Sequence, residues 1–216
     1  YSLPSPEQVL TWKEKTPPNF KFFPKITNTV SHFRRLINVT DVVTDYATSV
    51  LNFGDQLGMV FLQLHDNFKP KDFDRVEKFV KDWPKEVPLA IEVRSAEWFE
   101  EENFEKFSQL LEDNNIANII VDTAGRRDML HMRLTSDTAF IRYVGANADS
   151  DYARLDDWLE RIKLWKKEGL KNLYFFVHQN VELASPLLSA YFIEKVNAEF
   201  GTKIHVPVMA QPKALF

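Results

Sequence analysis

The sequence predicts an α/β fold, a TIM-barrel-like (β/α) barrel with mainly parallel strands, and three observations support this prediction. Six short hydrophobic runs each end in polar or charged residues. Helical patterns separate most of these runs, and strands that alternate with helices form parallel sheets. No glycine-rich phosphate-binding fingerprint follows any run, which argues against a dinucleotide-binding fold. In such barrels the chemistry lies at the C-terminal ends of the strands, so the polar run ends predict a functional site.

Composition limits the class of protein. The chain has 216 residues, of which 44% are hydrophobic, and we expect one domain over residues 1–216. A net charge of −4 makes nonspecific nucleic-acid binding an unexpected function. The absence of cysteine excludes disulfides, thiolate nucleophiles and cysteine-based zinc sites, and it suits the cytoplasm, which is the expected compartment. No apolar run approaches the roughly 20 residues of a membrane span.

The N-terminal half alternates helical and extended patterns. Ser5, Pro6 and Gln8 form the capping signal of a first helix that runs to about Lys15. The apolar run Phe20–Ile26 predicts a buried strand. Beyond it, apolar spacings of three or four residues predict helices, and short apolar runs bounded by turn residues predict strands. These elements are the helix Thr40–Gln56, the strand Met59–Leu64, the helix Asp72–Trp83 and the strand Leu89–Val93.

The C-terminal half continues the alternation. The helix Glu100–Asp113 precedes an apolar strand, Ile116–Val121. Thr123–Asp137 has no clear long period and is expected to form a loop with a short helix. The elements that follow are the strand Ala139–Val144, the helix Tyr152–Lys167 capped by Gly169, the strand Leu173–Val177, a helix over roughly Pro186–Phe200 ended by Gly201, and an extended tail, Ile204–Met209.

Glu92 and Arg94 close the strand Leu89–Val93. Because alternate residues of a strand face the same side, both side chains are expected to point into one pocket. A carboxylate and a guanidinium in one pocket suit acid/base catalysis combined with anion binding. The alternative is a structural ion pair that only fills the top of the barrel. Trp98, which follows in the same segment, is a candidate substrate-binding residue.

Asp122 and Arg142 belong to strands that are otherwise apolar. Asp122 is a candidate base, metal ligand or orienting carboxylate, and the alternative is a cap for the turn after the strand. Arg142 lies among apolar and aromatic neighbours, so it must find a partner or reach solvent. It is a candidate clamp for a phosphate or carboxylate. The alternative is an ion pair with Glu92 or Asp122.

Further polar residues lie at or just past strand ends. His178 is a candidate general base or metal ligand, although a lone histidine is often only hydrogen-bonded. Lys25 could supply a cation for an anionic ligand or be a solvated charge. Gln63 could bind a substrate or be a satisfied core amide. The remaining candidates for substrate binding are His32 and Asn180.

The sequence gives little support for a metal or for a nucleophilic serine. Glu92, Asp122, His178 and His32 are plausible ligands as a set. However, no close-spaced His-x-His or His-Glu-x-x-His pair occurs, so no metal ligand is assigned. The chain has no Gly-x-Ser-x-Gly motif. The sequence names no cofactor and does not indicate an oligomeric state.

The order of these motifs resembles the YecE-like family, also called domain of unknown function 72, over nearly the whole chain. The opening Tyr1–Pro6 resembles the end of the family's Phe-Tyr-x-Leu-Pro stretch. Glu92–Arg94 with Trp98-Phe99 resembles its most specific motif, Glu-Phe-Arg-His-x-Ser-Trp. The other similar stretches are Phe20–Lys25 with Val30–His32, Leu57–Leu64, Asp122 and Arg142.

The sequence departs from the family pattern at four places. These are His65 for a usual proline, Ser95 for a histidine, Tyr143–Gly145 for a histidine-containing stretch, and His178–Asn180 for Phe-Asn-Asn. The chain therefore resembles a divergent member, in which a mechanism that needs those histidines would not operate unchanged. The resemblance implies a TIM-barrel-like fold and a β-α-β unit upstream of Tyr1 that would raise six strands to eight. It does not specify a function, because the family's activity is not established.

Three functions are compatible with the sequence. The first is an enzyme for a small anionic or polyhydroxylated substrate, in which Glu92 is the acid/base and Asp122 orients or assists. Its anion contacts are expected to be Arg94, Arg142 and Lys25. The second is a metabolite-binding module without catalysis. The third, by fold analogy alone, is a metal-dependent phosphodiesterase or nuclease.

Overall fold

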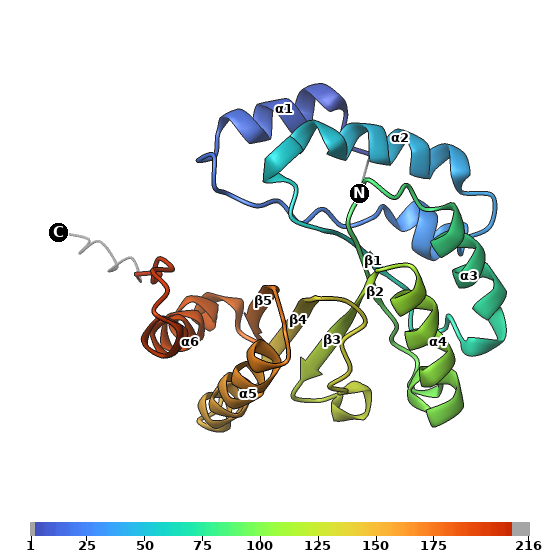
Figure 1. Cartoon of the computed structure of the whole chain (residues 1–216). Coiled ribbons are helices and arrows are strands. Elements are labelled where there is room, and N and C mark those ends of the chain that lie inside the picture. The colour runs from blue at the N-terminus through green and yellow to red at the C-terminus, as the bar shows by residue number, and fades with distance from the viewer. Residues whose placement is uncertain (1–2, 209–216) are drawn as a thin grey trace. The chain divides into compact units, whose positions relative to one another are not determined.

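The computed structural model describes residues 3–208, and it has an α/β architecture (Figure 1). Five strands form one sheet in the order β1-β2-β3-β4-β5, and this order is open rather than a ring within the described residues. The chain divides into two compact units, residues 3–120 with 131–140 and residues 121–130 with 141–208, so β3 and β4 run through both. Two residues of the sequence predictions lie outside the described residues. They are Tyr1, the first residue of the motif that resembles the family, and Met209, the last residue of the expected tail.

The first unit contains β1 (Val60–Gln63), β2 (Leu89–Glu92) and the start of β3 (Ala117–Thr123). β2 pairs in parallel with both of its neighbours. All four residues of β2 are buried, which explains its almost continuous apolar sequence. Gln63 lies opposite Glu92 in the register, so the polar ends of β1 and β2 are brought to the same level.

The segment Phe20–Ile26 is not the regular strand that the sequence predicts. It makes two isolated parallel bridges, from Phe22 to Leu57 and from Lys25 to Phe61. Pro24 lies between these bridges and has no N–H to give to a ladder. Its carbonyl still accepts the N–H of Phe61 at 3.0 Å, so the segment stays beside β1 and presents Lys25 there.

Four helices belong to the first unit: α1 (Pro6–Glu14), α2 (Thr40–Val50), α3 (Phe73–Asp82) and α4 (Glu101–Asp113). The predicted capping box of α1 is present, because the Gln8 N–H donates to Ser5 Oγ at 3.3 Å and the Ser5 N–H donates to Gln8 Oε1 at 3.0 Å. α2 ends earlier than expected and tightens into a 3₁₀ helix, Leu51–Gln56. Figure 1 shows α1 beside α2 and α3 beside α4.

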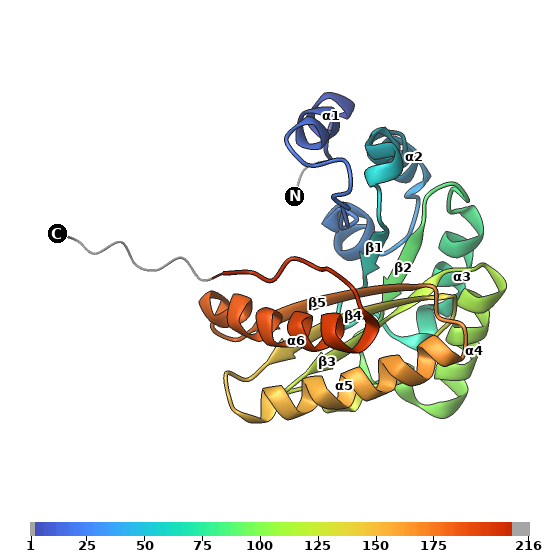
Figure 2. The ribbon, with the colours of Figure 1, turned by 60° about the vertical axis from the view of Figure 1, so that its left-hand side comes forward.

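The second unit contains the end of β3, most of β4 (Thr138–Gly145), α5 (Ser150–Lys167), β5 (Asn172–Gln179) and α6 (Ser185–Phe200). Helix α6 packs against both α5 and β5 (Figure 2). Phe175 of β5 joins them, since its ring centroid lies 5.7 Å from that of Trp158 and 4.5 Å from that of Phe192. Gly201 ends α6 in the left-handed conformation, as predicted. Within residues 3–208, every helix is too short or too polar to cross a lipid bilayer.

His131 is a half-buried titratable group of the first unit, and its Nδ1 atom is shielded from solvent. Its ring centroid lies 4.8 Å from that of Phe104 and 6.0 Å from that of Phe99. Burial lowers the pKa of His131 from 6.5 to about 4, because the imidazolium loses its hydration there. Between these pH values the unfolded chain binds a proton that the folded chain does not. Stability conferred by the neutral ring is therefore full above pH 6.5 and is lost as the pH falls toward 4.

We expect His131→Phe to remove this acid sensitivity. Wild-type protein should lose about 2 kcal/mol more stability than the variant between about pH 7.5 and pH 4.5. Urea unfolding at the two pH values measures the difference. His205→Gln is the matched control, because His205 is exposed and its replacement should leave the wild-type drop in place. Equal losses in wild type and His131→Phe would contradict the assignment.

Candidate functional site

A series of polar contacts crosses the ends of β1 and β2 in the first unit. Lys25 Nζ donates to Gln63 Oε1 at 2.7 Å, and Gln63 Nε2 donates to Glu92 Oε1 at 2.8 Å. Arg94 Nε lies 3.5 Å from the same Glu92 oxygen and 3.1 Å from Asp66 Oδ1. The structure thus brings together four predicted residues, which we call the strand-end cluster: Lys25, Gln63, Glu92 and Arg94.

The strand-end cluster has a buried anion and more accessible cations. Glu92 is 1% exposed, whereas the side chain of Arg94 is 37% exposed and Lys25 is half-buried. A carboxylate at this depth requires hydrogen-bond donors or a charged partner, and Gln63 and Arg94 supply them. The partners also fix the amide of Gln63, since its oxygen faces the ammonium and its nitrogen faces the carboxylate.

Two histidines lie close to each other in the same unit. His32 belongs to a one-turn π-helix, Thr29–Phe33, a rare form that is frequent at functional sites. Its ring centroid lies 5.2 Å from that of His65, and its Nδ1 lies 2.7 Å from Ser31 Oγ. His65 Nδ1 accepts the N–H of Asn67 at 3.1 Å, so a neutral His65 carries its proton on Nε2.

The pKa of His32 depends on nearby charges, including those of Lys25 and Arg94 in the strand-end cluster. Burial lowers the pKa of His32, and the positive charges of His65, Lys25 and Arg94 lower it further, whereas Asp66 raises it. The net effect is a pKa below the ordinary value of 6.5. The pKa of His32 is therefore sensitive to the charges of two predicted anion-binding residues, Lys25 and Arg94.

Arg35 ties together the loops that carry the two histidines. Its Nη1 donates to Asn67 Oδ1 at 2.6 Å, and its Nη2 lies 3.3 Å from a carboxylate oxygen of Asp72. The loop after His32 needs such a restraint, because left-handed backbone angles cost residues with a Cβ roughly 1–2 kcal/mol each. Three residues of this loop have left-handed φ values: Arg35 (48°), Leu36 (64°) and Asn38 (50°). The contacts of Arg35 therefore help to set where His32 and His65 stand.

Trp98 does not contact solvent, contrary to the expectation that it binds substrate. It is 0% exposed, and its Nε1 donates to the carbonyl of Phe68 at 2.8 Å. Its ring packs against those of Phe73 and Phe107, with centroids 6.3 Å and 5.4 Å away. The structure corrects the role of Trp98 to a core residue that anchors the segment after Arg94, because no surface of its ring is left for a ligand.

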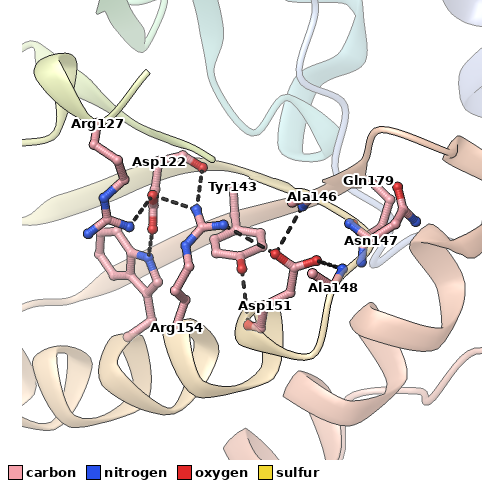
Figure 3. Close-up of polar contacts among 10 residues, drawn as sticks. Asp122, Arg127, Tyr143, Ala146, Asn147, Ala148, Asp151, Arg154 and Gln179 are labelled. Carbon is pink, nitrogen blue, oxygen red and sulfur yellow. Dashed lines mark hydrogen bonds and ion pairs between the residues drawn. The ribbon is translucent and has the colours of Figure 1, made fainter. Parts of the chain in front are cut away.

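Asp122 lies in the second unit and is enclosed by donors (Figure 3). Its Oδ1 accepts from Arg154 at 2.6 Å and from Arg127 at 3.0 Å, and its Oδ2 accepts from Trp158 Nε1 at 2.8 Å. The residue is 2% exposed. Both oxygens are therefore engaged, and the side chain is directed at α5, which carries Arg154 and Trp158.

Asp151 is a second buried carboxylate of this unit, and sequence reasoning missed it. It accepts the N–H groups of Ala146 and Ala148 at 2.9 Å and 3.1 Å, and Arg154 Nη1 lies 3.3 Å away (Figure 3). Burial raises the pKa of Asp151, but these donors and Gln179 outweigh it and hold the pKa below its usual value. The available signal was an aspartate in the first turn of α5 with an arginine three residues later.

The other predicted residues of the second unit are more dispersed. Arg142 is half-buried on β4. His178 is 40% exposed on its side chain, and its Nδ1 lies 3.4 Å from Glu182 Oε1. Asn180 is exposed, and its N–H donates to the carbonyl of Gly145 at 3.2 Å. Within residues 3–208, no group of three or more His, Asp or Glu side chains could hold a metal ion.

Sequence reasoning also missed His65 and Asp66 as candidate residues. Both are exposed and follow directly on the predicted strand Met59–Leu64, which was the available signal. The first unit therefore holds most of the predicted ligand contacts, and the second unit holds the others: Asp122, Arg142, His178 and Asn180.

Comparison with known proteins decides the family. A family model described as "Protein of unknown function DUF72" matches residues 1–213. The chain belongs to the DUF72 family. Two curated relatives of this DUF72 chain are UPF0759 protein YecE from Escherichia coli K12 and from Escherichia coli O157:H7. Each is 27% identical over 239 aligned residues, which cover 100% of the chain and 86% of the relative.

Solved structures of DUF72 proteins share the fold. One from Enterococcus faecalis V583 has a TM-score of 0.75 at 16% identity, covering 98% of this chain and 86% of that chain. One from Thermotoga maritima MSB8 has a TM-score of 0.71 at 22% identity, covering 92% of this chain and 81% of that chain. The resemblance predicted from the motifs is thereby confirmed, whereas the family's description specifies no activity.

Proposed function

We propose that this DUF72 protein is an enzyme that acts on a small anionic or polyhydroxylated substrate by acid/base chemistry at the ends of β1 and β2. The observation that carries the proposal is the ordered contact from Lys25 through Gln63 to the buried carboxylate of Glu92. Acid/base chemistry on an anionic substrate requires a fixed proton acceptor with cations nearby. Glu92 is the proton acceptor here, and Lys25 and Arg94 are the cations.

A substrate reaches the carboxylate of Glu92 by displacing the guanidinium of Arg94. The contact between these two side chains has a length of 3.5 Å, which makes it the loosest contact of the strand-end cluster. Arg94 is also partly exposed, so an anion can draw its guanidinium outward and uncover Glu92 Oε1. Catalytic contacts that are long without substrate commonly tighten when it binds.

Other parts of the proposal rest on the second unit and on the fold class. Within the second unit, Asp122 acts as a carboxylate that orients its own donors, Arg154, Arg127 and Trp158. Arg142, His178 and Asn180 remain proposed contributors. A TIM-barrel-like architecture is supported by six extended segments that alternate with helices, and a cytoplasmic location by the cysteine-free sequence.

A metabolite-binding module without catalysis is the second candidate. The observation that favours it is the 1% exposure of Glu92, because a carboxylate that stays covered can hold its neighbours without exchanging a proton. In that case Lys25, Gln63 and Arg94 bind the ligand and nothing reacts.

A metabolite screen distinguishes these two functions. The purified protein is incubated with phosphorylated, carboxylated and polyhydroxylated compounds, while thermal shift reports binding and NMR reports products. We expect one class both to raise the melting temperature and to be converted. Binding without conversion would favour the binding module. If no class binds or reacts, both candidates fail.

A further inference from the structure

We propose that Lys25, His32, His65 and Arg94 bind a doubly charged oxyanion, such as a phosphate monoester, and that His32 takes up a proton when it binds. We call these four residues the cation cluster. The inference rests on the proposed function and specifies it, because it selects the anionic substrate class over neutral polyhydroxylated compounds and couples binding to pH.

The donors of the cation cluster come from separate segments of the first unit. Lys25 lies on the bridged segment beside β1, and His32 lies on the π-helix that follows. His65 follows β1, and Arg94 follows β2. The neutral ring of His65 presents an N–H at Nε2, because its Nδ1 accepts from Asn67. N–H donors of this kind match the several acceptor oxygens of a phosphate group.

The charges around His32 indicate why a dianion should bring a proton with it. With neutral imidazoles, the two cations Lys25 and Arg94 are balanced by the two carboxylates Glu92 and Asp66. A dianion therefore leaves an excess of negative charge in a half-buried place. Protonation of one imidazole offsets part of that excess, since opposite charges at close range favour the charged form.

His32 rather than His65 is the residue that accepts this proton. His65 Nδ1 already accepts the N–H of Asn67, whereas a protonated His32 can donate from Nδ1 to Ser31 Oγ. In the free protein, burial lowers the pKa of His32 most, the nearby cations lower it further, and Asp66 raises it. A bound dianion adds negative charge beside His32 and offsets the effect of the cations, so the pKa of His32 should rise on binding.

Sulfate is the probe that tests the inference. It remains a dianion from about pH 5.5 to pH 8, so any proton taken up on binding goes to the protein. Isothermal titration calorimetry in two buffers of different ionisation enthalpy counts these protons. We expect uptake approaching one proton per sulfate and an affinity that falls up to about tenfold per pH unit as His32 deprotonates. NMR should show a raised His32 pKa in saturating sulfate.

Two variants separate the histidines. His32→Gln keeps a polar side chain but cannot take a proton, so its sulfate affinity should be independent of pH and its proton uptake should vanish. His205→Gln changes an exposed histidine outside the cation cluster, and it should behave as wild type. Inorganic phosphate in the same titrations checks that the site is not peculiar to sulfate.

The outcomes separate this inference from the proposed function. Sulfate binding without proton uptake, or uptake that survives in His32→Gln, overturns the role of His32. Absence of sulfate binding at about pH 5.5 overturns the oxyanion class. Conversion of a neutral polyhydroxylated compound together with that absence sustains the proposed function and defeats this inference alone.

Discussion

Replacing Asp122 with alanine should lower the free energy of unfolding by about 3–5 kcal/mol, because it leaves buried donors without their partner. Trp158 Nε1 loses its acceptor, and Arg154, whose side chain is 16% exposed, keeps only Asp151 as a carboxylate partner. Urea unfolding followed by circular dichroism measures the change at one pH. The effect is large because the partners left behind cannot regain full hydration.

The control for this variant is Asp128, an aspartate six residues further along the chain. Asp128→Ala breaks an ion pair with Arg126 at 3.0 Å, but Asp128 is 46% exposed on its side chain. Surface pairs of this kind contribute up to about 1 kcal/mol, so the stability should change little. Asp122→Asn should fall between the two, since the amide still accepts a hydrogen bond from one donor. A loss below about 1 kcal/mol for Asp122→Ala would show that the enclosed carboxylate is not an anchor.

Glu92→Gln should lower kcat on the substrate found in the screen by about 10²–10⁴-fold while the fold survives. Glutamine has nearly the shape of glutamate and still offers an oxygen to Gln63 Nε2, so the packing at the end of β2 is retained. What it removes is the group that can accept and return a proton. Steady-state kinetics measures kcat and KM, and circular dichroism checks the fold.

Glu97→Gln is the matched control for Glu92→Gln. Glu97 lies five residues further along the same segment and pairs with Lys69 near the surface. Its replacement makes the same chemical change without touching the strand-end cluster, so kcat should stay at the wild-type value. Unchanged turnover in Glu92→Gln would remove the carboxylate from the mechanism. An equal loss in both variants would mean that charge, and not position, matters.

The helices could be predicted because their signals are local. The Ser5–Gln8 capping box and the left-handed Gly201 are decided by neighbouring residues, and both occur where expected. The sequence located the extended segment Phe20–Ile26 but did not reveal that it lacks regular strand pairing. It makes two bridges around Pro24, and both join it to residues distant in sequence. The π-helix around His32 had no periodic signal at all, because it depends on tertiary contacts such as those of Arg35.

The candidate site could be predicted where the pairing register of two strands determines it. It could not be predicted where the answer depends on which face of the sheet a side chain occupies. Parallel pairing sets Gln63 against Glu92, and the polar ends of two strands reveal this from sequence. Asp122 is different, because its strand is buried along six successive residues and no polar alternation reveals which face a side chain takes. Only the structure shows that Asp122 faces α5. Trp98 likewise could not be assigned, since an aromatic ring serves a core and a ligand equally well.

The loop between β4 and α5 already contains its own anion. TIM barrels commonly hold a substrate phosphate with backbone amides in the loops after their last strands. Here the carboxylate of Asp151 occupies two such amides, those of Ala146 and Ala148. An incoming phosphate would have to compete with a side chain that is tethered in place and effectively present at very high concentration. We therefore expect this loop to bind oxyanions weakly, in keeping with the proposal that such a ligand binds the cation cluster of the first unit.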